Sequence, residues 1–178
     1  DNTDEVYRQM AAGKTMVIQM APSVRINLAE ALGQKPGTVS TGKIVHALKK
    51  IGFYKVFDSD FSADLTIMEE GSEFLKRLKE GGTLPMFTSC CPGWVKYCET
   101  YGPDLLGHLS TAKSPQQMFG SVIKTYFAQK EGLKREDICS VSVMPCTAKK
   151  FECKRPEMKD DVDIVITVME LARMIRTA

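Results

Sequence analysis

Short apolar runs alternate along this chain with longer stretches in which apolar side chains recur every three or four residues. The short runs are bounded by turn residues and predict strands, at residues 16–20, 53–57, 84–87, 138–144 and 164–166. The longer stretches predict helices, at residues 24–32, 41–51, 61–80, from Pro92, 115–129 and from Met169, with Ser23 as the cap of the first. Strands separated by helices imply right-handed crossovers and a parallel sheet. The expected fold class is therefore α/β, a parallel sheet of four to five strands flanked by helices, with sites outside the carboxyl ends of the strands.

The composition is that of a globular protein and does not indicate a charged partner. The chain has 178 residues, of which 43% are hydrophobic and 26% charged, as in a globular domain with its own core. A formal net charge of +2 gives no electrostatic reason to expect nucleic acid or a membrane surface as a partner. No apolar run approaches the roughly 20 residues of a membrane span, and the acidic N-terminus has no signal-peptide core. Because the sequence begins at Asp1 rather than Met, we expect an excised or renumbered piece.

Six cysteines could form disulfides, bind a metal or do neither. They are Cys90, Cys91, Cys98, Cys139, Cys146 and Cys153. Disulfide frameworks are typical of small secreted domains, and the adjacent Cys90 and Cys91 are poorly placed for two separate bridges. Reduced thiols and a cytoplasmic location are therefore expected, with export to the periplasm on a partner's signal left open. Cys98 and Cys139 are expected in or near the core, and Cys153 is expected to have no special role.

Two cysteine-bearing segments stand out because each follows a predicted strand and precedes a predicted helix. They are residues 88–94 and 144–152. At such a turn, backbone N–H groups and the positive end of the helix stabilise a thiolate, which is the form that binds iron. The pattern by itself leaves two readings open, a metal site or buried structural cysteines.

Both segments resemble signature motifs of the iron-only ([FeFe]) hydrogenases. The first two of the three family motifs are TSCCPxW and MPCxxKxxE, and the two segments match them at every fixed position. Residues 20–25, 66–71 and 112–117 also read as family segments, so the similarity extends over nearly the whole chain. The resemblance implies that residues 1–178 are the N-terminal lobe of the domain that holds the active-site H-cluster, one lobe of the large hydrogenase domain.

The resemblance also implies roles for individual residues. Cys91 and Cys146 would bind the [4Fe-4S] part of the H-cluster, and Lys149 would hydrogen-bond a cyanide ligand of its diiron subcluster, which carries CO and CN ligands. Protons would pass between the diiron subcluster and solvent through Cys90, Glu70, Ser110 and Glu73. Six further residues match positions that line the diiron pocket: Ala21, Pro22, Ser23, Pro115, Gln116 and Met144.

The relay residues have suitable chemistry, but each also has an ordinary reading. A thiol, a hydroxyl and two carboxyls can donate and accept protons, and Glu70 and Glu73 share a face because they are three residues apart on a predicted helix. The alternative is a solvated acidic helix face, with Ser110 a loop or cap serine and Lys149 a solvated lysine.

Three functions follow from the resemblance. As an enzyme, the domain would catalyse 2H⁺ + 2e⁻ ⇌ H₂ with a ferredoxin-like electron donor. As a non-catalytic module, it would resemble the hydrogenase-like proteins of cytosolic iron–sulfur assembly, which typically lack the relay cysteine. As a hydrogen sensor, it would often have altered relay positions. The presence of Cys90, Glu70 and Ser110 favours a hydrogenase.

The sequence departs from the complete family pattern. The third motif, which supplies the other two cluster cysteines, is absent, and so is the CxxC-rich run of the accessory ferredoxin-like domains. The remaining ligands are therefore expected from a missing C-terminal part or from a second chain, and this chain alone is expected to be inactive. Residues 155–163 also look shorter than the family pattern, as in a trimmed surface loop.

Overall fold

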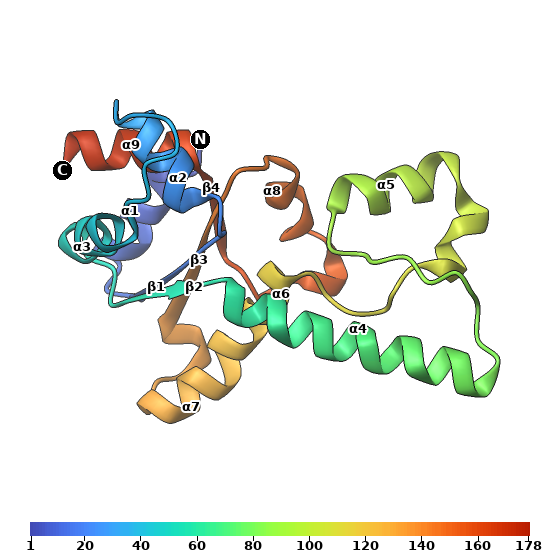
Figure 1. The fold of residues 1–178 in the computed structure, drawn as a ribbon. Coiled ribbons are helices and arrows are strands. Elements are labelled where there is room, and N and C mark those ends of the chain that lie inside the picture. Colours follow the sequence, from blue (N-terminus) through green and yellow to red (C-terminus); the bar gives the residue numbers. More distant parts are fainter.

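The computed structural model describes residues 1–178 as a parallel sheet with helices on both faces (Figure 1). The strands are β1 (Thr15–Met20), β2 (Lys55–Asp58), β3 (Ile138–Met144) and β4 (Ile164–Thr167), in the order β2-β1-β3-β4, and all three pairings are parallel. The helices are α1 (Thr3–Ala11), α2 (Val24–Ala31), α3 (Thr41–Ile51), α4 (Asp60–Glu80), α5 (Pro92–Tyr101), α6 (Pro115–Val122), α7 (Ala128–Glu131), α8 (Ala148–Glu152) and α9 (Val168–Thr177). A π-helix, Ile123–Phe127, joins α6 to α7, and short 3₁₀ helices cover Pro103–His108, Arg135–Asp137 and Pro156–Met158. The α/β class expected from the sequence is confirmed.

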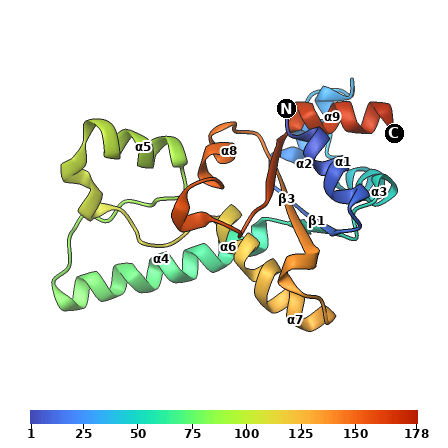
Figure 2. The same cartoon turned by 180° about the vertical axis from the view of Figure 1, so that it is seen from behind.

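The predicted strand at residues 84–87 is wrong. This segment lies in the arm, which we define as residues 60–111, and which projects away from the sheet (Figures 1 and 2). The helix α4 that begins the arm has 21 residues, and at 1.5 Å per residue it is about 30 Å long. The chain has therefore left the sheet before it reaches residue 84. Phe87 pairs only with Leu109, in an isolated bridge, and Pro85 has no N–H to extend a ladder.

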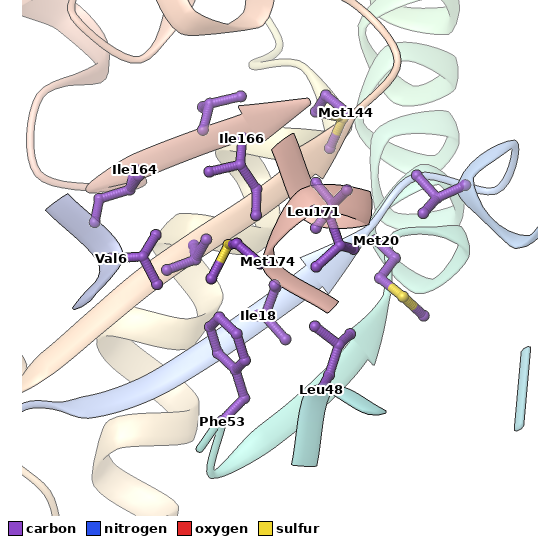
Figure 3. Packing of buried hydrophobic residues seen from close by; sticks show 14 of the residues in the cluster. Val6, Ile18, Met20, Leu48, Phe53, Met144, Ile164, Ile166, Leu171 and Met174 are labelled. Atoms are coloured by element: carbon purple, nitrogen blue, oxygen red, sulfur yellow. The ribbon is translucent and has the colours of Figure 1, made fainter. Parts of the chain in front are cut away.

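One face of the sheet carries the main core, because side chains alternate between the two faces along each strand. Met16, Ile18 and Met20 of β1 point to this face, together with Val141 and Val143 of β3. Helices α1, α2, α3 and α9 cover them with buried apolar side chains (Figure 3), among them Val6, Leu48, Leu171 and Met174. This face stabilises the sheet by apolar burial.

The opposite face changes character along the strands. Near their amino ends, Val17 and Ile138 pack against an aromatic and aliphatic cluster of α6 and the π-helix. Towards the carboxyl ends the buried side chains become polar, and Gln19 and Ser142 hydrogen-bond Gln116 of α6 in the interior. Polar groups are costly to bury unless they are paired, so this region points to a function at the carboxyl edge.

Gly120 lets α6 pack closely against the segment that precedes β4. A Cβ atom at this position would lie 2.5 Å from the Asp161 carbonyl oxygen and 2.6 Å from a Val162 methyl group. The side chain of Asp161 forms an ion pair with Lys113, which holds the same two segments together.

Replacing Gly120 with alanine is therefore expected to destabilise the protein by about 1–3 kcal/mol, because backbone must move to admit the methyl group. The free energy of unfolding from denaturant titration measures the effect. Gly42→Ala in α3 is the matched control, since a Cβ there meets nothing within 4 Å. Equal stability of the two variants would contradict the close packing.

Glu170 attaches the N-terminus and α8 to α9. Its carboxylate accepts hydrogen bonds from the backbone N–H groups of Asn2 (3.1 Å) and Thr167 (2.6 Å) and from the Lys150 ammonium (2.6 Å). Thr167 and Glu170 form a capping box at the start of α9. Burial opposes ionisation of Glu170, but these donors outweigh it and lower its pKa to about 2. This contact ties the start of helix α1, which the sequence pattern did not predict, to α9, and the Asn2 side chain also donates to the Val165 carbonyl of β4 at 2.8 Å.

The low pKa of Glu170 makes its contribution to stability pH-dependent. Folding lowers the pKa from 4.5 to about 2, so the contribution is present above pH 4.5 and is lost as the pH falls towards 2. Glu170→Gln is expected to cost about 1–3 kcal/mol at neutral pH, because buried donors lose a charged acceptor. This difference should shrink as denaturation is repeated at lower pH. The control is Glu30→Gln, whose side chain is exposed; a pH-independent loss in Glu170→Gln would contradict the assignment.

No helix in the structure combines the length and the apolar character needed to span a lipid bilayer.

Candidate functional site

Cys146 lies at the carboxyl edge of the sheet, where α/β folds usually have their sites. It follows β3, whose last residue, Met144, is buried. The neighbouring strand β1 ends beside it, since the Ala21 N–H donates to the Val143 carbonyl (3.1 Å). The structure thus places four predicted pocket residues near Cys146: Ala21, Pro22, Ser23 and Met144. Ser23 is the N-cap residue of α2, as the sequence predicted, although its hydroxyl makes no capping hydrogen bond.

Cys90 and Cys91 lie in the arm, directly before α5. Cys91 is the residue that precedes the first turn of α5, which begins with Pro92. The expectation that this turn follows a strand of the sheet is wrong, but the arm folds back so that α5 contacts α8, and Arg155 forms an ion pair with Glu99 of α5.

Lys149 connects the two cysteine-bearing turns. Its Nζ donates to the carbonyl oxygen of Cys90 at 2.7 Å and to both carboxylate oxygens of Glu152 at 3.2 Å. The side chains of Lys149 and Glu152 are 14% and 4% exposed, so this is an interior ion pair. The solvated reading of Lys149 therefore fails. Glu152 was part of the second motif but had no predicted role; its spacing of three residues from Lys149 on a helix is the signal that could have found it.

Two of the predicted relay residues are in direct contact. The hydroxyl of Ser110, which is buried, donates to Oε2 of Glu73 at 2.7 Å, and the Thr111 N–H donates to the same oxygen at 3.0 Å. Burial opposes ionisation of Glu73, but hydrogen bonds from Ser110, Arg77 and Thr111 outweigh it and hold its pKa below the ordinary value. Glu70 makes no such contact, and its Oε1 is shielded from solvent with no hydrogen-bond partner in the chain.

Arg77 holds the backbone next to Ser110 close to Glu73, although the sequence indicated only a charged residue on the surface of a helix. Its guanidinium binds Oε1 of Glu73 at 2.6 Å and donates to the backbone carbonyls of Thr83, Gly107, His108 and Leu109. These carbonyls belong to the two segments that α4 carries at its far end. Arg77 therefore positions Ser110 against Glu73. Backbone acceptors leave no sequence signal, so this role was visible only in the structure.

The remaining residues singled out from the sequence are buried or partly buried. Pro115 begins α6, and Gln116 is 1% exposed, with its amide hydrogen-bonded to Ser142 and Glu152. Cys98 and Cys139 are buried, as expected, and burial raises the pKa of Cys139 to about 12. Burial also raises the pKa of Cys153, which is half-buried.

The donors present suit part of an iron–sulfur site. Cys90, Cys91 and Cys146 are all exposed and not in disulfides, so their sulfurs are free to meet a ligand, and thiolates are the usual ligands of such clusters. No three His, Cys, Asp or Glu side chains gather closely enough to hold a metal ion on their own. The thiols present therefore fit part of the ligand set of an iron–sulfur cluster.

Nearly the whole chain is similar in sequence to known proteins. A family model described as the iron only hydrogenase large subunit, C-terminal domain, matches residues 14–178. The NADP-reducing hydrogenase subunit HndD of Solidesulfovibrio fructosivorans is 57% identical over 173 residues, which cover 92% of this chain and 30% of that protein. The cytosolic iron-sulfur assembly component 3 of Bos taurus is 39% identical over 191 residues, which cover 97% of this chain and 40% of that protein.

Solved structures share the fold as well as the sequence. A variant of apo [FeFe]-hydrogenase HydA1 from Chlamydomonas reinhardtii superposes with a TM-score of 0.89 at 41% identity, over 97% of this chain and 47% of that chain. This chain therefore spans less than half the length of these relatives.

Proposed function

This chain belongs to the iron-only hydrogenase large-subunit family, and on that premise we propose that it forms one side of a site for the reversible reduction of protons to H₂. The observation that carries the proposal is the Lys149 hydrogen bond to the Cys90 carbonyl, which brings the two cysteine turns together. Cys91 and Cys146 would each supply a thiolate to the [4Fe-4S] part of an H-cluster. The other ligands would come from a further part of the protein or from a second chain.

When bound, the H-cluster would supply the electron store and the iron at which hydrogen is formed or split. The residues of this chain would hold it, exclude water and move protons. Ala21, Pro22, Ser23, Pro115, Gln116 and Met144 would line the diiron pocket. Lys149 would present its ammonium group to a cyanide ligand while its other donors stay on Glu152 and the Cys90 carbonyl.

The chain's own contacts support a proton route along the arm. Cys90 would exchange a proton at its sulfur, and Glu70, whose shielded Oε1 has no partner, would pass it onwards. Ser110 and Glu73 are already joined at 2.7 Å, within the reach that proton transfer requires. Glu73 would complete the route to solvent. A ferredoxin-like protein would deliver the electrons.

The relatives leave one other function to be distinguished. Identity to the cytosolic iron-sulfur assembly protein is 39%, against 57% to the hydrogenase subunit. Cys90 favours the hydrogenase, because a protein that only binds an iron–sulfur cluster has no need of a second, proton-carrying thiol beside Cys91.

Hydrogen evolution by the full-length protein tests the proposal. The protein would be produced with the maturases that assemble the H-cluster and assayed with a reduced electron donor, with protein produced without maturases as the control. We expect H₂ only from the matured form. A matured protein that shows the absorption of iron–sulfur clusters but evolves no H₂ would contradict the proposal and favour the assembly function.

A further inference from the structure

A line of buried hydrogen bonds leads from the centre of the sheet to the lysine between the two cysteine turns. The Ser142 hydroxyl of β3 donates to Oε1 of Gln116 at 2.8 Å, and Nε2 of Gln116 donates to Oε2 of Glu152 at 3.0 Å. Glu152 then holds the ammonium group of Lys149, which reaches the Cys90 carbonyl. The sheet is thus connected to the arm through three side chains and a backbone carbonyl.

Gln116 is also fixed through its backbone. The side chain of Gln19 on β1 donates to the Gln116 carbonyl at 3.0 Å, and the Ser59 hydroxyl donates to the side chain of Gln19 at 3.0 Å. Two neighbouring strands therefore hold the first turn of α6, one by its backbone and the other by its side chain.

Because this network is buried, the donor and the acceptor in each of its hydrogen bonds can be assigned. Gln19, Gln116, Ser142 and Glu152 are between 0% and 3% exposed, so water cannot replace a lost partner. A carboxylate only accepts hydrogen bonds, so Gln116 must present its NH₂ group to Glu152. Its carbonyl oxygen then faces Ser142, which must donate. Reversal of the amide would set two acceptors against each other at Glu152.

We propose that Ser142 is a positioning residue for the site: through Gln116 and Glu152 it holds Lys149 across the two cysteine turns. The inference rests on the proposed function, in which Cys91 and Cys146 must stay at a fixed spacing. The buried network that begins at Ser142 would maintain that spacing. Without the Ser142 hydroxyl, the buried carbonyl oxygen of Gln116 has no donor. The amide is then held only at its NH₂ end, and as the side chain shifts, its hydrogen bond to Glu152 weakens and Lys149 is held less firmly against Cys90.

The chain supplies a matched control on the same strand. Ser140 lies two residues before Ser142 and is equally buried, but its hydroxyl has no hydrogen-bond partner. Ser142→Ala and Ser140→Ala therefore remove the same atom from the same face of β3, and only the first interrupts the network.

The test measures acylation of Lys149 by an amine-reactive ester in the cluster-free full-length protein, read by mass spectrometry, with Lys150 as the internal reference. We expect Ser142→Ala to raise the Lys149 rate about fivefold, the factor for one lost buried hydrogen bond, and Ser140→Ala to leave it unchanged. Ser142→Thr, which restores a hydroxyl, should bring the rate back down.

Two results would overturn the inference. One is equal Lys149 reactivity in Ser142→Ala and Ser140→Ala. The other is a parallel rise at Lys149 and Lys150, since Lys150 is held separately by Glu170 and should respond only to general loosening. The acylation needs no bound cluster, so it gives an answer even if the matured protein evolves no hydrogen. Failure of the proposed function is thereby distinguished from failure of the network.

Discussion

Replacing Cys90 with serine in the matured full-length protein is expected to lower the rate of hydrogen evolution at least about 100-fold, the lower end of the range for losing a positioned acid–base group. The cluster should stay in place, because the proposed ligands are Cys91 and Cys146. A serine hydroxyl has nearly the same size as the thiol but gives up its proton far less readily. Hydrogen evolution measured together with iron content separates turnover from cluster binding.

Cys153→Ser is the control for the Cys90 variant, since Cys153 lies outside the site and its thiol is half-buried. Its activity should match that of the natural protein. Full activity in Cys90→Ser would show that the proton takes another route. Loss of iron in Cys90→Ser would instead make Cys90 a ligand.

Replacing Lys149 with methionine is expected to destabilise the protein by about 3–5 kcal/mol, because it leaves a buried carboxylate without its cation. Glu152 has only 4% of its side chain exposed, and the single donor that remains, Gln116, is neutral. Replacing Glu152 with leucine in the same protein should recover much of the loss, since a matched apolar pair is often no less stable than a buried ion pair.

Denaturant unfolding of the cluster-free full-length protein measures both Lys149 variants. Lys130→Met on α7 is the control, because that lysine is exposed and makes no ion pair. A loss in Lys149→Met no larger than in the control would show that Lys149 is solvated.

The sequence predicted the sheet well because three of its four strands, β1, β3 and β4, are short and almost wholly buried. β3 is the clearest case, with all seven residues buried. The long helix after β2 was also predicted nearly to its ends, since Gly81 takes the left-handed conformation that stops it. Residues 84–87 have the same apolar composition as a strand, but their pairing depends on where α4 delivers them. Local pattern carries no information about that distance.

The two cysteine-bearing segments could be singled out from the sequence, whereas the contacts that hold them together could not. Gln19 and Ser142 sit at inward positions of strands, where the alternating pattern predicts apolar side chains. Their polar character could have signalled a buried network, but not its partners. Arg77 acts on backbone carbonyls, which every residue has. The helix α1 was missed because the contacts that attach it lie far along the chain: Asn2 bonds Val165 and Glu170, and Val6 packs into the main core.

The length of α4 makes the arm a lever. A tilt of one degree at β2 would move the far end of a helix about 30 Å long by about 0.5 Å. That displacement exceeds the tolerance of a metal–sulfur bond of fixed length, about 0.2 Å. The stiffness of α4 alone therefore cannot fix the distance between Cys91 and Cys146. Two contacts hold the arm against the segment around α8, from Lys149 to Cys90 and from Arg155 to Glu99. They restrict this displacement close to the two cysteine turns.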